Sequence, residues 1–307
     1  MRMLVFGHMN PDTDTIVSAI AYADLASKRG FEAKAVAQGE VNPESAFVLD
    51  KFGLTAPEVV TSVAGQKVAI VDTTELTQLP ADIAEAEVLA VTDHHKLGDL
   101  STANPLEMWV WPAGCTCTVL KNMYDFYGVE VPKGIAGAML CAILSDTVMF
   151  KSVTCTPADK KAVEELAKIA GVSEPMDLGM EMFKVKSAVD GTPMRDLVFR
   201  DYKDFDMGGH GVGIGQLEVV DLDILKPYVD GLYEEIQKVK EEKGHHTIML
   251  MLTDIMKEGT EMLYVSDDKD VFKKSFGIEA GDRSFWLQGC MSRKKQVVPD
   301  FQSKAFA

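Results

Sequence analysis

The chain has 307 residues, 47% of them apolar and 25% charged, which is typical of a folded globular protein of about two domains. It carries 47 acidic against 31 basic residues, and this net charge of −16 argues against nucleic acid and anionic membranes as partners. Five cysteines without a dense disulfide pattern favour a reducing compartment, and the sequence shows neither a signal peptide nor an apolar run of bilayer length, so we expect a cytoplasmic protein.

Short β-branched runs alternate with helical periodicity over residues 1–186. Strands are predicted at 3–7, 33–39, 68–73 and 88–95, and helices at 13–30, 43–53, 117–128, 134–146 and 156–171. Gly30 and Gly53 mark helix ends, and Thr156 followed by Pro157 marks a helix start. Because strands and helices alternate, we expect an α/β domain built on a parallel sheet.

Small and turn-forming residues at 187–194 predict a linker or hinge. Beyond it the expected elements are strands 200–207 and 211–220, a helix at 226–244, strands 247–254 and 261–267, and a helix at 269–277. The first two strands form a hairpin about Gly208 and Gly209, and the glycine-rich run there lacks the residues of a phosphate loop. The sequence therefore predicts a smaller α+β domain at 195–307.

Polar side chains follow three of the predicted parallel strands. They are His8, Asp12 and Asp14 after the first, Asp72 after the third, and Asp93, His94 and His95 after the fourth. Ligands of such sheets bind at the carboxyl ends of the strands. Carboxylates and imidazoles without thiolates suit manganese, iron or cobalt. Asp146 ends an apolar helix, where its charge needs a partner, and a metal ion is a good one.

Each of these residues also has a purely structural explanation. Asp12 and Asp14 can cap the helix that begins near Thr15, and we expect capping of Asp14 in particular. Asp72 and Asp93 suit turns after strands, and the histidines suit packing. Capping cannot explain all of the residues that converge, so a metal site is favoured. Their number exceeds what one ion needs, so we expect two ions that share a carboxylate, the arrangement used for displacement at phosphorus.

A basic cluster stands near the end of this acidic chain. It consists of Arg293, Lys294 and Lys295, and Lys203 stands among aspartates in the second domain. A solvated face would explain such a cluster by itself. Its flanks, QGCM and QVVP, are typical of ordered chain, which favours basic residues held toward an anionic ligand between the two domains.

Together these motifs resemble the family II, manganese-dependent inorganic pyrophosphatases of the DHH phosphoesterase superfamily. The resemblance covers essentially the whole chain and rests on GHMNPDTDT (7–15), VTDHHK (91–96), AILSDT (142–147), FKSVTCT (150–156), DYKDF (201–205) and SRKKQVVP (292–299). The Asp-His-His motif marks only the superfamily. The first and last motifs together point to the pyrophosphatases.

The resemblance implies a set of metal ligands by position. They are His8, Asp12, Asp14, Asp72, His94 and Asp146. His8 and Asp12 would hold one ion and Asp14 and His94 the other, with Asp72 bridging and Asp146 completing the site. Two or more Mn²⁺ ions are implied, with Co²⁺ or Mg²⁺ as substitutes.

The resemblance also implies catalytic and substrate-binding residues. These are His95, which would face the leaving group, and Lys203, Arg293 and Lys294, which would bind the phosphates; Asp93 would orient the histidines. Pyrophosphate would be hydrolysed to two orthophosphates by a hydroxide that bridges the ions, in a cleft between the DHH domain and the C-terminal domain. A homodimer through the N-terminal domain is implied as well.

One departure and two alternatives stay open. Thr73 and Thr74 stand where many family members have His-Asn, which alters the surroundings of the bridging aspartate. A DHH-type phosphodiesterase or nucleotide phosphatase would need a surface for a base or for nucleic acid, which the acidic charge disfavours. A non-catalytic metal or phosphate sensor could lose the lysines and the arginine, all of which are present here.

Overall fold

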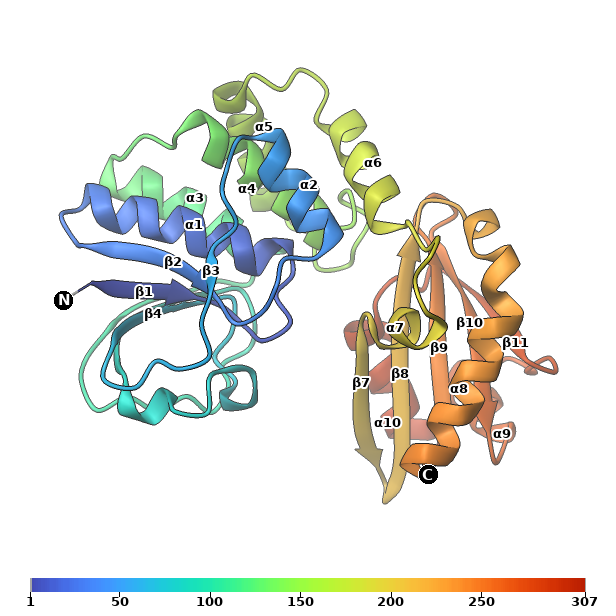
Figure 1. The fold of residues 1–307 in the computed structure, drawn as a ribbon. Coiled ribbons are helices and arrows are strands. Elements are labelled where there is room, and N and C mark those ends of the chain that lie inside the picture. The colour runs from blue at the N-terminus through green and yellow to red at the C-terminus, as the bar shows by residue number, and fades with distance from the viewer. Residues whose placement is uncertain (1, 307) are drawn as a thin grey trace. The chain divides into compact units, whose positions relative to one another are not determined.

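The computed structural model describes residues 2–306, which divide into two compact units (Figure 1). The first unit runs to Val185 and the second begins at Lys186. Among residues 2–306, no helix has both the length and the apolar character needed to cross a bilayer.

The first unit contains a six-stranded sheet in which every pairing is parallel, in the order β3-β2-β1-β4-β5-β6. Its strands are β1 (Met3–Phe6), β2 (Ala33–Ala37), β3 (Glu58–Val59), β4 (Lys67–Val71), β5 (Glu87–Asp93) and β6 (Glu107–Val110). The parallel sheet is confirmed, and the short edge strands β3 and β6 are additions to the four predicted strands. The strand order reverses between β1 and β4, which opens a crevice at their carboxyl ends.

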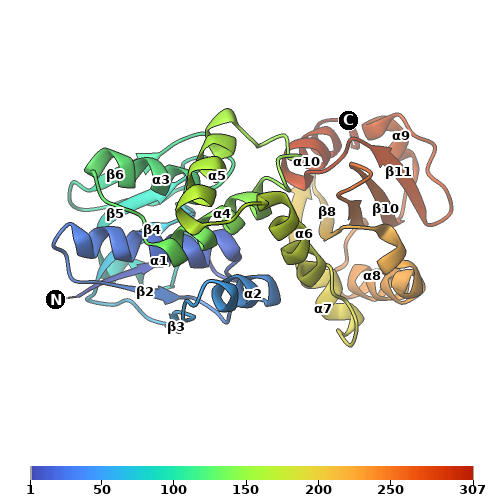
Figure 2. The same cartoon turned by 90° about the horizontal axis from the view of Figure 1, so that it is seen from above.

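Helices cover one face of this sheet. They are α1 (Thr13–Lys28), α2 (Pro43–Lys51), α3 (Thr116–Tyr127), α4 (Lys133–Asp146), α5 (Pro157–Ala170) and α6 (Pro175–Lys186). Helix α1 packs against β1, α3 and α4, and Figure 2 shows these helices together over the sheet. Two 3₁₀ turns, η1 (Leu76–Gln78) and η2 (Ile83–Glu85), belong to the segment that packs on the other side, where Leu79 and Ile83 share a core with Phe6 and Ile70.

Helix α6 is not predicted from the sequence, and its packing explains why. Gly179 interrupts its periodicity, and a side chain there would lie 3.2 Å from Leu144 Cδ1 and 3.5 Å from Met149 Cγ. The glycine weakens the helical signal because it lowers helix propensity, yet it lets α6 approach the end of α4 closely.

Helix α5 begins with a capping box that also ties it to α3. The Asp159 carboxylate accepts hydrogen bonds from Thr156 N (2.7 Å), Gly114 N (3.0 Å) and Thr118 Oγ1 (2.6 Å), and the Thr156 hydroxyl accepts one from Asp159 N (3.4 Å). Asp159 is fully buried. One carboxylate therefore satisfies donors from three segments of the chain.

Replacing Asp159 with alanine is expected to lower the free energy of unfolding of the first unit by about 2–4 kcal/mol, because it leaves the buried Gly114 and Thr118 donors unpaired and removes a helix cap. Urea unfolding followed by circular dichroism measures the change. Glu164, exposed on the same helix, is the matched control, and its replacement by alanine should change stability by less than about 0.5 kcal/mol. Equal losses in the two variants would contradict the assignment.

The second unit contains a five-stranded mixed sheet in the order β11-β10-β9-β8-β7. Its strands are β7 (Tyr202–Met207), β8 (His210–Val219), β9 (Thr247–Asp254), β10 (Gly259–Ser266) and β11 (Ser284–Gln288). Within residues 2–306, the β8–β9 pairing is parallel and the other pairings of this sheet are antiparallel. The hairpin is confirmed, because Met207 pairs with His210 across Gly208 and Gly209, whose φ angles are 65° and 83°.

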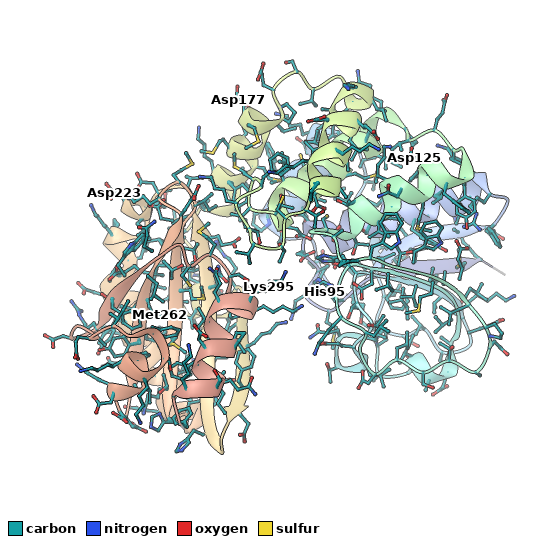
Figure 3. All side chains as sticks on the ribbon, turned by 180° about the vertical axis from the view of Figure 1, so that it is seen from behind. His95, Asp125, Asp177, Asp223, Met262 and Lys295 are labelled. Carbon is teal, nitrogen blue, oxygen red and sulfur yellow. The ribbon has the colours of Figure 1, made fainter. Side chains whose placement is uncertain are left out.

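Helices pack on both faces of the second sheet. They are α7 (Met194–Phe199), α8 (Val229–Lys243), α9 (Asp270–Phe276) and α10 (Val298–Lys304), with 3₁₀ turns η3 (Leu222–Ile224) and η4 (Lys226–Tyr228) and a π turn η5 (Arg293–Val297). Leu197 and Ile236 share one core with the sheet. Met262 lies in the other core with Phe272 and Phe301 (Figure 3). Helix α7 is not predicted, since six residues are too few to show a helical period.

The predicted linker at 187–194 starts two residues after the unit boundary and contacts the second unit. Ser187 Oγ accepts a hydrogen bond from Val220 N (3.2 Å), and Val189 is buried in the α7–α8 core. Arg200 donates to Lys186 O (2.9 Å) and so fixes the first residues of this segment.

Candidate metal centre

The loop after β1 carries His8 and ends at Asp12, the N-cap of α1. Asp12 Oδ1 accepts a hydrogen bond from Thr15 N (2.9 Å), while Asp12 Oδ2 lies 3.4 Å from His8 Nε2. The turn requires Gly7, because a Cβ there would lie 2.8 Å from Val71 O. The expectation that Asp14 caps α1 is wrong. Asp12 holds that position, because its backbone is extended whereas Asp14 already lies within the helix.

Asp14 instead points from the first turn of α1 to the start of α3. Its Oδ2 accepts a hydrogen bond from Thr116 N (2.7 Å), and its Oδ1 accepts hydrogen bonds from Cys117 N (3.1 Å) and Ser18 Oγ (2.9 Å). Asp14 is fully buried. The first N–H groups of α3 have no acceptor within their own helix, and their hydrogen bonds to Asp14 therefore stabilise its negative charge.

Asp72 lies directly after β4, between the two histidines of the centre. Its Oδ2 is 3.4 Å from His8 Nε2 and its Oδ1 is 3.5 Å from His94 Nε2. Thr15 Oγ1 donates to Oδ2 (2.6 Å) and Thr116 Oγ1 donates to Oδ1 (2.9 Å). The Asp72 φ angle of +63° is an uncommon conformation that aspartate adopts more readily than most residues. Nothing in the sequence singles out the two threonines, which become recognisable only from these contacts.

Backbone carbonyl groups orient both histidines. His8 Nδ1 lies 2.8 Å from Met9 O, and His94 Nδ1 lies 3.0 Å from Ala113 O. A carbonyl oxygen can only accept, so each Nδ1 carries a proton and each ring turns its Nε2 toward the carboxylates. This is the arrangement found around histidines that ligate metals.

Asp93 holds the two histidines that follow it. Its Oδ1 accepts hydrogen bonds from His94 N (2.7 Å), His95 N (3.0 Å) and the His95 ring at Nδ1 (2.9 Å). Asp93 is fully buried, whereas the side chain of His95 is 35% exposed (Figure 3). Asp93 therefore fixes the His95 ring through Nδ1 and leaves its Nε2 edge for another partner.

Asp146 is the last residue of α4. Its Oδ2 lies 3.9 Å from His94 Nε2. The chain then turns sharply, because Val148, Met149 and Phe150 all have positive φ angles, of 48°, 53° and 68°. Three such residues in succession are strained, and backbone strain of this kind is concentrated at functional sites.

The predicted ligands fall into groups whose donor atoms lie within 4.8 Å of one another. The groups are His8, Asp12 and Asp72; Asp14, His94 and Asp146; and Asp72, His94 and His95. All six predicted ligands therefore meet, with Asp12 and Asp14 in different groups and Asp72 in contact with both halves. Cys115 and Cys117 also lie beside Asp14. Burial raises the pKa of Cys117 to about 12 and that of Cys115 as well, so both thiols are protonated in the metal-free protein.

The electrostatics of this cluster fit divalent cations. Burial raises the pKa of Asp72 to about 7, with the Asp14 carboxylate adding to the shift. Burial also raises the pKa of Asp146 well above its ordinary value, again with help from Asp14. Burial alone would lower the pKa of His8, but Asp12 and Asp72 raise it above 6.5. Clustered carboxylates of this kind need compensating positive charge, and oxygen and imidazole donors suit Mn²⁺.

The basic cluster of the second unit forms an ordered turn. Gln296 Oε1 accepts hydrogen bonds from Met291 N (2.8 Å) and Ser292 N (2.9 Å), and Ser292 Oγ accepts one from Lys295 N (3.3 Å). The flanks on both sides of Lys294 are therefore fixed, as the sequence predicts.

Arg293 and Lys203 approach the same point of the second sheet. The Arg293 guanidinium donates to Asp201 O (2.7 Å), Asp201 Oδ1 (2.6 Å) and Ile214 O (3.2 Å). Ile214 is the register partner of Lys203, which is exposed on β7. Arg293 thus sits beside the strand pair that carries Lys203, with part of its donor capacity committed to the protein.

Thr73 and Thr74 are buried, and Thr74 contacts the loop after the Asp-His-His motif. Thr74 Oγ1 accepts a hydrogen bond from Gly98 N (2.7 Å). Gly98 is required there, because a Cβ would lie 2.3 Å from Thr74 O. In this chain the residue two after Asp72 therefore anchors the 94–100 loop.

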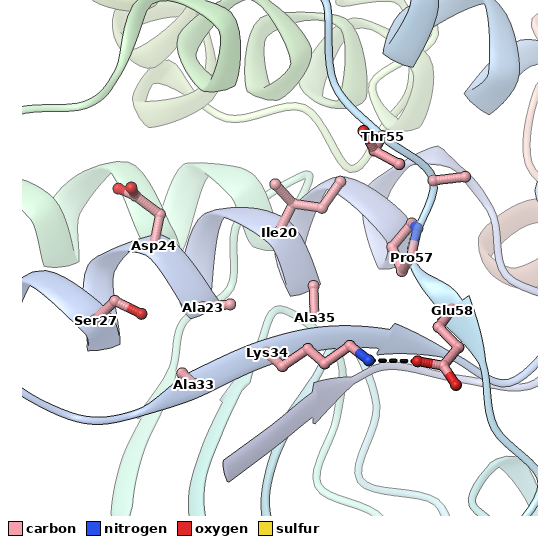
Figure 4. Close-up of a pocket in the computed structure, with 11 residues that line it drawn as sticks. Ile20, Ala23, Asp24, Ser27, Ala33, Lys34, Ala35, Thr55, Pro57 and Glu58 are labelled. Carbon is pink, nitrogen blue, oxygen red and sulfur yellow. Dashed lines mark hydrogen bonds and ion pairs between the residues drawn. The ribbon is translucent and has the colours of Figure 1, made fainter. Parts of the chain in front are cut away.

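A surface groove lies elsewhere in the first unit, between α1, β2 and residues 55–58 (Figure 4). Lys34 and Glu58 form an ion pair across it. None of the predicted metal or substrate residues lines this groove.

Comparison with known proteins decides the family. The sequence matches the DHH family, N-terminal domain, over residues 2–143 and the DHHA2 domain over residues 180–303. It is 51% identical over 99% of the chain and 98% of the relative to an Archaeoglobus fulgidus protein named "Probable manganese-dependent inorganic pyrophosphatase". It is 41% identical, over 97% of both chains, to the manganese-dependent inorganic pyrophosphatase of Bacillus subtilis. The chain belongs to the manganese-dependent inorganic pyrophosphatase family.

A solved structure of this pyrophosphatase family agrees with the sequence matches. A crystal structure described as "Methanococcus jannaschii putative family II inorganic pyrophosphatase" superposes with a TM-score of 0.83 at 40% identity, covering 99% of both chains. The predicted family and the α/β fold with a parallel-sheet DHH domain and a C-terminal mixed-sheet domain are therefore confirmed.

Proposed function

We propose that this protein hydrolyses pyrophosphate to two orthophosphates and requires manganese. The observation that carries the proposal is the position of Asp72, whose two oxygens face His8 on one side and His94 on the other. A carboxylate so placed is suited to bridge two ions. Relatives at 41% and 51% identity that carry this name support the same activity.

His8, Asp12 and Asp72 would hold one Mn²⁺, and Asp14, His94, Asp72 and Asp146 the other. When bound, two such ions supply Lewis acidity and bring the pKa of water near neutrality. The chain keeps its ligands ready for this, because Met9 O and Ala113 O hold His8 and His94 with Nε2 toward the carboxylates.

His95 is the proposed proton donor to the departing phosphate. Asp93 holds its Nδ1, so the proton would leave from Nε2. Lys203, Arg293 and Lys294 would bind the phosphate oxygens, the arginine through paired donors and the lysines as point charges. Since these three residues belong to the second unit and the metal ligands to the first, catalysis would require closure in a cleft between the domains, turning at the start of the 187–194 segment.

Phosphate release from metal-free protein tests the proposal. Pyrophosphate and nucleotide substrates are compared after addition of Mn²⁺, Co²⁺ or Mg²⁺. We expect rapid release from pyrophosphate with Mn²⁺, weaker activity with the other ions, and little release from nucleotides. Equal rates on nucleotides, or release that survives a chelator, would refute it.

The proposed setting is the cytoplasm, without nucleic acid as partner. The five cysteines are free, which suits a reducing compartment. The net charge of −16 would repel nucleic acid. Cell fractionation and a gel-shift assay at low salt test these two statements.

Metal binding is expected to weaken as the pH falls through about 7. Burial, aided by Asp14, raises the pKa of Asp72 from 3.8 to about 7, so below that pH the folded metal-free protein holds a proton that the ion must displace.

The same shift affects stability. Between about pH 4 and 7, Asp72 is ionised in the unfolded chain but protonated in the folded chain, so this group lowers the free energy of unfolding as the pH rises. Calorimetry in buffers of different ionisation enthalpy should show more proton release per Mn²⁺ at about pH 6 than at about pH 8. Proton release independent of pH would contradict this.

We also propose that the protein forms a homodimer through the edge strand β6 of the first unit. Strand β6 ends the sheet. Met108 of β6 is 47% exposed. Phe126 of α3 is 70% exposed, and its ring packs on Trp109 of β6 with centroids 5.2 Å apart. A bare edge flanked by apolar side chains is suited to pair with a second copy.

Phe126→Glu is expected to raise the dimer dissociation constant by about 100-fold, because a charge replaces an apolar contact. Sedimentation velocity over a dilution series measures it. Ile169→Glu, a change at a half-exposed residue of α5, serves as control and should leave the dimer intact. A monomeric wild-type protein, or equal effects of the two variants, would contradict the proposed interface.

A further inference from the structure

A buried glutamate lies between the ends of two helices that carry proposed metal ligands. Glu44 stands in the first turn of α2, two residues after the N-cap residue Asn42, and is only 4% exposed. A carboxylate is seldom buried to this degree without a specific set of partners. The identity of its partners therefore indicates what it does.

One oxygen of Glu44 accepts two short hydrogen bonds from different helices. Thr13 Oγ1 donates to Oε1 at 2.6 Å, and Ser145 Oγ donates to the same atom at 2.6 Å. Thr13 is the first residue of α1 and Ser145 is the last but one of α4. Two hydroxyl groups from different helices therefore share one acceptor atom, which ties the two helix ends together.

The two donors are chain neighbours of the proposed ligands. Thr13 lies between Asp12 and Asp14, and Ser145 immediately precedes Asp146. Asp14 and Asp146 face the same histidine, His94, in one ligand group. Helices α1 and α4 also pack directly on each other, so any sliding of one along the other would move Asp146 relative to Asp14.

We propose that Glu44 is a positioning residue of the metal centre. By joining Thr13 to Ser145 through one oxygen, it sets the separation of the ligands on α1 from the ligand on α4. Helix α2 supports the same loop a second time, because Asn42 Nδ2 donates to Pro11 O (3.5 Å). This inference rests on the proposed metal centre and adds a residue that is not itself one of the proposed ligands.

Glu44→Ala, Ser145→Ala and the double variant test the inference. Calorimetric titration with Mn²⁺ gives the dissociation constant, and electron paramagnetic resonance reports whether the two ions are coupled. We expect Glu44→Ala to raise the dissociation constant by about 10- to 100-fold, the range typical of residues that orient ligands. Ser145→Ala should raise it less, and the double variant no more than Glu44→Ala, because both changes break the same link. Asp50→Asn, at an exposed aspartate of α2, is the control and should bind Mn²⁺ like the wild type.

The unfolding midpoint of each metal-free variant separates positioning from folding. If Glu44→Ala does not fold, Ser145→Ala becomes the deciding variant. Glu44→Gln keeps an oxygen that can accept from both hydroxyls, so we expect its affinity for Mn²⁺ to be close to that of the wild type. A dissociation constant for Mn²⁺ within twofold of the wild type in Glu44→Ala would overturn the inference. If Glu44→Ala does not fold, the same result in Ser145→Ala would overturn it. Additive effects of the two single changes in the double variant would overturn it as well. A wild-type protein that binds no Mn²⁺ or leaves pyrophosphate intact would instead refute the proposed function.

Discussion

Asp72→Asn is expected to reduce kcat for pyrophosphate hydrolysis by about 10²- to 10³-fold and to abolish the binding of at least one Mn²⁺ ion. The carboxylate faces both His8 and His94, at 3.4 and 3.5 Å, so its loss affects both halves of the centre. A metal ion contributes several kcal/mol of charge stabilisation to such a reaction, and each 1.36 kcal/mol is tenfold in rate, which gives about this range.

Asparagine is the informative replacement because it changes charge while preserving shape. Asp72 has a φ angle of +63°, a region that asparagine also tolerates, so the turn after β4 should persist. The amide nitrogen, however, would replace one acceptor that Thr15 or Thr116 now uses. The metal-free variant should therefore fold while its affinity for Mn²⁺ falls.

Steady-state phosphate release and metal analysis of the purified variant check this result. Asp50→Asn, which makes the same chemical change at an exposed site of the same unit, should leave both quantities unchanged. A variant of Asp72 that retains two ions and more than about a tenth of the wild-type rate would show that this residue does not bridge them.

The positions of the ligands follow from the sequence because strand ends are predictable. Parallel strands place their carboxyl ends at one edge of the sheet, so residues after β1, β4 and β5 had to converge. Strand β9, Thr247–Asp254, matches its prediction at both ends. All eight of its residues are buried, as expected for a short apolar run that forms a central strand. The local signals at Thr156 and Gly208 were equally reliable, since capping and turn formation depend on neighbouring residues.

The remaining features depend on contacts between distant parts of the chain. The role of Asp14 depends on α3, because its carboxylate accepts a hydrogen bond from Thr116 N, 102 residues away in the sequence. Glu44 meets Ser145 across 101 residues of sequence, and no local pattern marks that contact. Strand β6 is short and lies at the sheet edge, where propensity is a weak guide.

Lys203→Ala is expected to lower kcat/KM for pyrophosphate by about 10- to 100-fold while leaving Mn²⁺ affinity unchanged. A hydrogen bond to a charged group is worth about 1.5–3 kcal/mol, which corresponds to this range. Lys203 is exposed on β7, and its neighbour Asp204 is occupied by Lys243 and His245, each at 2.6 Å. Asp204 thus already pairs with two other groups, so we expect the Lys203 ammonium to be available to the substrate.

The Lys203 variant is informative because it separates an effect on kcat/KM from an effect on Mn²⁺ affinity. The metal ligands lie in the first unit and Lys203 in the second, so a loss of rate at constant Mn²⁺ affinity would assign Lys203 to the substrate. Lys274→Ala, at an exposed lysine of α9, removes the same charge from the same unit and should leave kcat/KM within about twofold. If both lysine variants lost activity equally, only the overall charge of the second unit would matter. A selective loss in Lys203→Ala would instead mean that this acidic protein attracts a multiply charged anion through cations held at one place. Charge spread over the surface would act on both variants alike.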